Sequence, residues 1–132
     1  MVAKDKKVIE TFDLTKYYGP ILGIEDLNLE INEGEIFGFL GPNGSGKTTT
    51  IRLLLGVIKK TNGRIFFYGE DVSKQRLKIL KNIGYLPGDV GLYKDMSGTA
   101  FLDHLLRLRD GENYLRHQKS LNDLKERFKI NF

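Results

Sequence analysis

The chain has 132 residues, which suits a single domain built around one hydrophobic core. Its composition, 40% hydrophobic and 29% charged, is that of an ordinary globular protein, and the lack of cysteine excludes disulfides, thiol catalysis and cysteine metal sites. The net charge of +4 is spread along the sequence, so no basic block predicts a nucleic-acid partner. No apolar stretch approaches the roughly 20 residues that span a bilayer.

The first part of the chain predicts strands. Residues 8–14 alternate weakly between apolar and polar side chains, and residues 21–31 alternate clearly from Leu27 onward, which predicts one solvent-facing side. Asn32-Glu33-Gly34 predicts a turn. The apolar run at 36–40 that follows is typical of a buried strand.

Residues 41–49 read Gly-Pro-Asn-Gly-Ser-Gly-Lys-Thr-Thr and fit GxxxxGK[ST], the phosphate-binding loop of nucleoside triphosphatases. The three glycines of this loop allow positive φ and a close approach of the backbone to phosphate. Lys47 adds a mobile positive charge for the β- and γ-phosphates, and the Thr48 hydroxyl can hold Mg²⁺. We therefore predict that the ligand is held by Gly41, Pro42, Asn43, Gly44, Ser45, Gly46, Lys47, Thr48 and Thr49.

The context of this loop supports the motif. Residues 47–56 predict a helix, whose N-terminus directs the positive end of its dipole at a bound anion. Strand, glycine loop and helix thus follow one another in the required order, which disfavours a chance glycine turn before a lysine. A dinucleotide site of the GxGxxG type does not fit the glycine spacing.

The rest of the chain predicts a strand at 64–68, a helix at 73–82, a short strand at 83–86, a helix N-capped by Ser97 and a last helix at 115–129. Together these elements predict an α/β fold with an N-terminal β layer. The buried, parallel part of the sheet would consist of 36–40 and 83–86.

Several segments of the sequence indicate the same family. The loop has the form GPNGSGKTT, residues 14–19 read Leu-Thr-Lys-Tyr-Tyr-Gly, and residues 83–87 read Ile-Gly-Tyr-Leu-Pro. This combination resembles the ATP-binding subunits of ABC transporters, in their exporter-like branch. The resemblance runs from about residue 9 to the end of the chain. It implies a P-loop NTPase fold of the ABC type with an N-terminal antiparallel β layer. Residues 1–96 would form the β layer and P-loop core, and residues 97–132 the start of the helical region.

The same resemblance implies ATP and Mg²⁺ as ligands and assigns roles to individual residues. Tyr18 would stack on adenine, although a half-buried tyrosine at a strand end is the alternative. Lys47 would stabilise charge in the transition state. The family usually has glutamine at the Q-loop, where it touches Mg²⁺ and the attacking water, but this chain has Gly88, followed by Asp89 as a possible substitute.

The family's later motifs do not occur in this sequence. The signature LSGGQ, the apolar strand ending in Asp-Glu and the switch histidine are all missing, so we expect a partial ATP-binding domain in which ATP hydrolysis is left open. The resemblance implies membrane permease subunits and a second ATP-binding subunit as partners, at the cytoplasmic face of the cell membrane. An inert nucleotide-binding fragment and a soluble, non-transport ABC ATPase are the alternatives. A GTPase or nucleoside kinase fits less well, because in those families the loop usually opens the domain.

Overall fold

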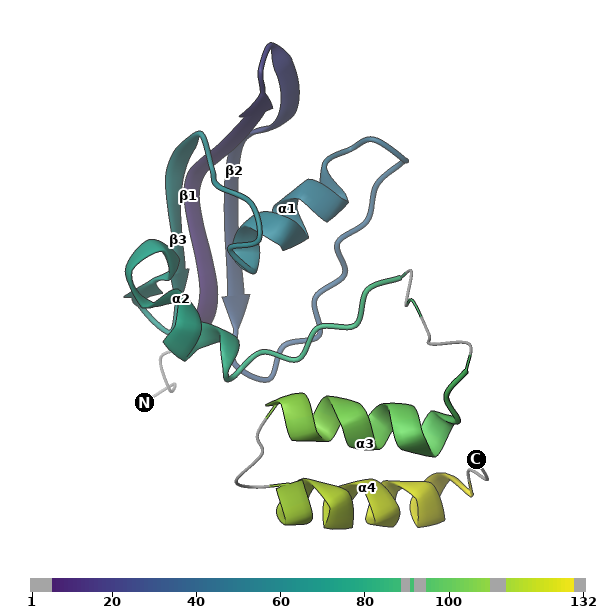
Figure 1. Ribbon diagram of the computed structural model, residues 1–132. Helices are drawn as coiled ribbons and strands as arrows, with labels where there is room; N and C mark the ends of the chain where they lie inside the picture. The colour runs from purple at the N-terminus through teal and green to yellow at the C-terminus, as the bar shows by residue number, and fades with distance from the viewer. Residues whose placement is uncertain (1–5, 89–90, 92–94, 110–113, 130–132) are drawn as a thin grey trace. The chain divides into compact units, whose positions relative to one another are not determined.

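The computed structural model describes residues 6–88, 91, 95–109 and 114–129. The chain divides into two units, Met1–Gly84 and Tyr85–Phe132 (Figure 1), and each is described by itself.

A four-stranded antiparallel sheet forms the first unit's frame. Strands β1 (Lys7–Tyr18) and β2 (Ile21–Asn32) make a long hairpin, and β3 (Asn62–Phe67) pairs with the other edge of β1. The two-residue strand β4 (Glu70–Asp71) completes the order β2-β1-β3-β4. The predicted N-terminal antiparallel β layer is therefore confirmed.

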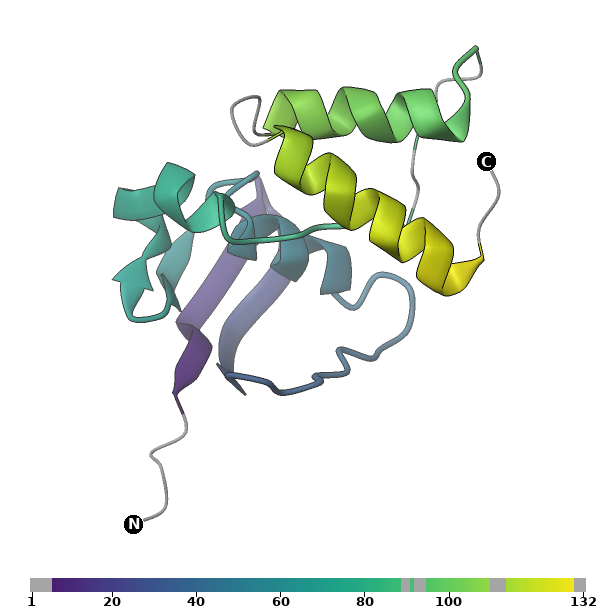
Figure 2. The same cartoon turned by 90° about the horizontal axis from the view of Figure 1, so that it is seen from below.

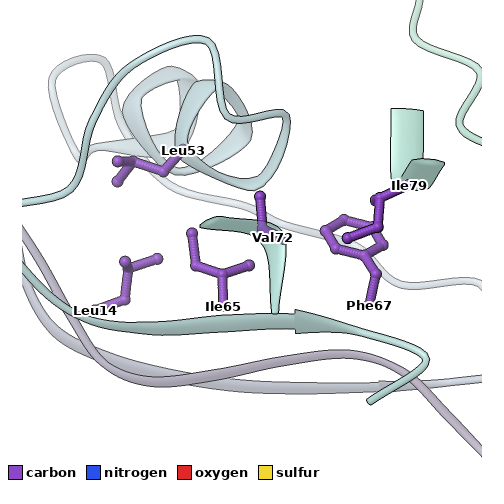
Figure 3. Packing of buried hydrophobic residues seen from close by; sticks show 6 residues of the cluster. All are labelled: Leu14, Leu53, Ile65, Phe67, Val72 and Ile79. Atoms are coloured by element: carbon purple, nitrogen blue, oxygen red, sulfur yellow. The ribbon is translucent and has the colours of Figure 1, made fainter. Parts of the chain in front are cut away.

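Two helices of the first unit cover one face of this sheet. Helix α1 (Lys47–Leu54) and helix α2 (Val72–Leu80) lie on the same side of the strands (Figures 1 and 2). Their apolar side chains meet those of β1 and β3 in a single buried cluster (Figure 3) made of Leu14, Leu53, Ile65, Phe67, Val72 and Ile79. Each fully buried side chain of this size stabilises the unit by about 1.5–3 kcal/mol, so α1 is held to the sheet by its apolar face.

The prediction of strands at 36–40 and 83–86 was wrong. Both segments are irregular, and within the described residues neither pairs with any strand of the sheet. Ile36 is fully exposed and Leu40 is 91% exposed. The apolar pattern correctly marks segments suited to burial on both faces. A strand also needs neighbouring backbone to satisfy its N–H and C=O groups, and pattern alone does not supply that partner.

The second unit contains a pair of helices, α3 (Gly98–Arg109) and α4 (Tyr114–Phe128), which lie side by side (Figures 1 and 2). As predicted, Ser97 caps α3: its Oγ accepts a hydrogen bond from the backbone N–H of Ala100 at 3.3 Å. No helix in the described part of the chain combines the length and apolar character needed to cross a membrane. The boundary of the family's helical region at residue 97 stays a prediction.

Candidate functional site

The glycine-rich loop leads directly into α1, and two of its glycines adopt left-handed backbone conformations. Gly44 has φ of 84° and Gly46, the N-cap of α1, has φ of 88°. A side chain would be strained at both positions. Gly41 does not adopt positive φ. There a Cβ atom would lie only 2.6 Å from Ser45 Oγ, so glycine is needed for space.

The loop packs tightly against β2 at Gly46. A Cβ atom on this residue would collide with the side chain of Ile24 and would lie 2.8 Å from the carbonyl oxygen of Gly23. The close approach fixes the start of α1 against the hairpin. It also leaves the helix without a side-chain cap, because glycine has none to offer.

The Lys47 side chain folds back over the loop. Its ammonium donates to the carbonyl oxygens of Gly41 at 2.5 Å and Pro42 at 2.7 Å, and to Ser45 Oγ at 3.4 Å. All three acceptors are neutral, whereas a phosphate oxygen is charged and accepts a stronger hydrogen bond. The ammonium is therefore placed at the loop with partners that an anion can replace.

Thr50 is a residue that the sequence analysis missed. It is 1% exposed, and its Oγ1 donates to the carbonyl oxygen of Gly46 at 3.0 Å, alongside its backbone N–H at 2.8 Å. These two bonds tie the first turn of α1 to the end of the loop. The spacing of Thr50 could have indicated this role. Thr50 is four residues after Gly46 and three before Leu53, which places it on the helix face that enters the core.

Tyr18 and the loop border the same pocket, which has a volume of about 330 Å³. The Tyr18 hydroxyl lies 3.5 Å from Thr49 Oγ1, and the Tyr18 side chain is 43% exposed. The hairpin contributes Tyr18, Ile21, Leu22 and Gly23 to the lining, and the loop with α1 contributes Asn43, Gly44, Gly46, Lys47, Thr48 and Thr49. Gly41, Pro42 and Ser45 do not line it.

Tyr17, the residue before Tyr18, makes its side-chain hydrogen bond outside the pocket. The hydroxyl of Tyr17 donates to Glu25 Oε1 at 3.0 Å, and Tyr17 does not line the pocket. This hydrogen bond to the Glu25 carboxylate, reinforced by its negative charge, raises the pKa of Tyr17 above its usual value near 10.0. Of the two adjacent tyrosines, Tyr18 is thus the one that faces the loop.

The pocket has an apolar part and a polar part. Tyr18, Ile21 and Leu22 offer an aromatic ring and aliphatic surface at the hairpin. Lys47, Thr48 and Thr49 offer a cation and two hydroxyls at the loop. This division suits a molecule with a planar base at one end and an anionic group at the other.

Magnesium would need oxygen ligands, and Thr48, an exposed residue at the start of α1, carries a hydroxyl. In the described part of the chain, no group of three or more histidine, aspartate or glutamate side chains could hold a metal ion. In a metal–nucleotide complex, phosphate oxygens would supply further ligands to an ion at Thr48.

Gly88, the residue at the predicted Q-loop position, belongs to the second unit and is exposed. A Cβ atom there would meet nothing within 4 Å. Its role stays a prediction, and Asp89 lies outside the described residues.

A family model described as ABC transporter matches residues 24–131. The chain belongs to the ABC transporter family. Curated ABC relatives include the bacitracin transport ATP-binding protein BcrA of Bacillus licheniformis, 47% identical over 72% of this chain and 31% of the relative. The lipopolysaccharide export system ATP-binding protein LptB of Escherichia coli (strain K12) is 35% identical over 89% of this chain and 50% of the relative. The chain thus spans about a third to a half of the length of these ABC proteins.

Solved structures confirm the ABC-type P-loop NTPase fold. One described as the ATP-binding subunit of an ABC transporter has a TM-score of 0.75 over 92% of this chain and 50% of its own length, at 24% identity. The structure of cbiO1 from Clostridium perfringens, described as part of the ABC transporter complex cbiONQ, has a TM-score of 0.56 at 28% identity, over 61% of this chain and 34% of its own length.

Proposed function

We propose that this chain binds Mg·ATP through its P-loop, as part of the ATPase subunit that powers an ABC membrane transporter of the exporter type. The observation that carries the proposal is the shared pocket of Tyr18 and the loop. An aromatic ring at one end and a lysine with two hydroxyls at the other match the two ends of a nucleoside triphosphate.

The loop residues fit the proposed ligand. The left-handed backbone at Gly44 and Gly46, where no Cβ atom is present, would let the main chain approach a bound phosphate closely. Lys47 would exchange its carbonyl partners for phosphate oxygens, and Thr48 would hold Mg²⁺. The ion, when bound, would neutralise charge on the phosphates.

The transport role is supported by relatives. One is named as a bacitracin transport protein and another as part of a lipopolysaccharide export system. By the same reasoning, we propose that the chain works with transmembrane permease subunits and a second ATP-binding subunit. Its place would be the cytoplasmic face of the cell membrane, where it would be attached through those partners.

A second candidate function is nucleotide binding without turnover. It is favoured by the irregular segment at 36–40, which leads into the loop without strand partners among the described residues. Phosphate release separates this candidate from an active ATPase.

Isothermal titration calorimetry with Mg·ATP tests the binding proposal. Lys47→Ala should weaken binding about tenfold to a hundredfold, because it removes a charge-assisted contact to phosphate worth about 1.5–3 kcal/mol. Lys59→Ala is a matched control, since Lys59 is exposed and lines a different cavity of the same unit. Equal affinity of the Lys47→Ala chain and the parent would contradict the site assignment.

The transport proposal needs a separate experiment. A gene for a membrane subunit beside the gene for this chain, with a product that co-purifies with the chain in detergent, would support it. Stable association with ribosomes or DNA instead would favour a non-transport ABC ATPase.

A further inference from the structure

Gly23 occupies an irregular position in the hairpin, close to the proposed base site. In the pairing of β1 with β2, Lys16 is opposite Ile24 and Tyr17 is opposite Leu22, so Gly23 has no partner residue. Such an extra residue is a β-bulge, a feature that redirects nearby side chains and is frequent beside functional sites. The next pair along the hairpin is Tyr18 with Ile21.

The Tyr18 ring lies directly against Gly23. A Cβ atom on Gly23 would be 3.0 Å from Tyr18 Cε2, 3.3 Å from Tyr18 Cδ2 and 3.1 Å from the carbonyl oxygen of Lys16. A methyl group there would press on the ring from one side and on β1 backbone from the other. The ring can therefore lie this close to β2 because Gly23 has no side chain.

Gly23 also touches the phosphate-binding loop. Its carbonyl oxygen is 2.8 Å from the point where a Cβ atom of Gly46 would be placed. One residue of β2 is thus in contact with both the aromatic ring and the loop. Gly23 therefore neighbours both ends of the pocket.

Lys16 makes another contact with the same ring. Its ammonium lies 5.0 Å from the centre of the Tyr18 ring, within the range of a cation–π interaction. Tyr18 lines the pocket and Lys16 does not. The ammonium can therefore restrain the ring without occupying the pocket.

We propose that Gly23 and Lys16 are positioning residues that hold the Tyr18 ring at a fixed distance from the P-loop, as a preformed platform for the nucleotide base. The inference rests on the proposed function, since it concerns the base end of the same site. Holding the ring in place before binding lowers the cost of ordering it in the complex. Neither residue belongs to the phosphate-binding motif.

Comparing two ligands tests this proposal. Mg·ATP carries a base, and Mg·tripolyphosphate does not, so a residue that acts through the ring should affect only the first. By calorimetry, Gly23→Ala should weaken Mg·ATP about three- to tenfold, a part of the stacking contribution. Lys16→Met should weaken it about two- to fivefold, and Lys16→Arg should restore it. Tripolyphosphate affinity should stay within about twofold of the parent throughout.

Matched controls and a double-mutant cycle separate positioning from folding effects. Gly84→Ala adds a methyl group where nothing lies within 4 Å, and Lys6→Met removes the equivalent cation from the Tyr68 ring at 4.9 Å. Both should leave the two affinities unchanged. In a Tyr18→Ala background, Gly23→Ala and Lys16→Met should have no further effect.

Equal losses for both ligands, or effects that persist without the Tyr18 ring, would overturn the inference. Unchanged ATP affinity in both variants, beside a parent that binds ATP, would overturn it as well. A parent chain that binds neither ligand would instead overturn the proposed function itself.

Discussion

The hydroxyl oxygens of Tyr18 and Thr49 lie 3.5 Å apart, although 31 positions separate the two residues in the chain. Tyr18 is the last residue of β1 and Thr49 lies in the first turn of α1. This proximity brings the end of the hairpin to the start of the helix. It follows that an aromatic side chain and the glycine-rich loop, far apart in sequence, can act on one ligand.

Base binding should depend on the Tyr18 ring and only slightly on its hydroxyl. We expect Tyr18→Ala to weaken Mg·ATP by about 1–3 kcal/mol, the usual contribution of stacking between a base and an aromatic ring. Tyr18→Phe should be nearly silent, because the ring remains and the 3.5 Å contact with Thr49 is at the limit of a hydrogen bond. Calorimetric titration of the three proteins measures the difference.

Tyr68→Ala is the control for this series. Tyr68 is also half exposed, at 51%, and also lies beneath a lysine, but it does not line the pocket. Its replacement should leave ATP affinity unchanged. A loss in Tyr18→Phe as large as that in Tyr18→Ala would show that the tyrosine acts through its hydroxyl.

The sequence predicts well those features whose cause lies within one segment. The alternation of residues 21–31, the Ser97 cap and the spacing of the phosphate-binding loop are all local signals, and the corresponding elements occur within one to a few residues of their expected limits. Left-handed glycines at 44 and 46 follow from the same loop motif.

Features that depend on contacts between residues far apart in the sequence could not be predicted. Residues 36–40 are apolar enough for a strand, but pairing is a tertiary property and no partner is present in the described chain. The contact of Gly23 with both Tyr18 and Gly46 depends on hairpin register and on the docking of α1. Neither leaves a signal in the local sequence.

The stability of the first unit should depend on pH through Asp71, the N-cap of α2. Its Oδ1 accepts hydrogen bonds from Ser73 Oγ at 2.6 Å and from the Ser73 backbone N–H at 2.8 Å. These bonds hold the pKa of Asp71 below its usual value of 3.8. A lowered pKa in the folded state means that the ionised carboxylate stabilises it. The stabilisation is complete above the unfolded pKa and is lost as the pH falls through the folded pKa.

Replacing Asp71 should therefore lower the free energy of unfolding at neutral pH and lower it less in acid. Asp71→Ala should lower the free energy of unfolding by about 0.5–2 kcal/mol at neutral pH, the usual cost of losing an N-cap. The difference from the parent should shrink as the pH falls below 3.8. Urea unfolding followed by circular dichroism measures this difference. Asp71→Asn supplies a cap that does not titrate, so the difference in unfolding free energy between Asp71→Asn and Asp71→Ala should not vary with pH in this range. A difference between Asp71→Ala and the parent that is independent of pH would contradict the prediction.

The exposed apolar segment before the loop should make the chain self-associate. Ile36 is fully exposed and Leu40 is 91% exposed, in an irregular segment without strand partners in the described chain. Unpaired backbone beside apolar side chains is a recognised aggregation hazard. We expect poor solubility and a broad thermal transition. Ile36→Lys with Leu40→Lys should reduce light scattering, whereas lysines at exposed Thr61 and Asn62 should not. A sharp, concentration-independent transition of a soluble parent would contradict this.

A polypeptide of residues 1–132 alone should bind Mg·ATP weakly and should neither hydrolyse it above background nor dimerise in its presence. In the proposed site Lys47 would hold phosphate and Thr48 would hold Mg²⁺, but hydrolysis also needs a group that orients and polarises the attacking water. Within residues 1–132, Gly88 offers no side chain for that role, and no Asp-Glu strand end or LSGGQ segment is present. Phosphate release should therefore be equal in the parent and in Lys47→Ala, and sedimentation should show no ATP-dependent dimer.

Steady turnover that Lys47→Ala abolishes would contradict this expectation. Asp89, outside the described residues, would then be the first position to replace, because it directly follows Gly88, the predicted Q-loop position.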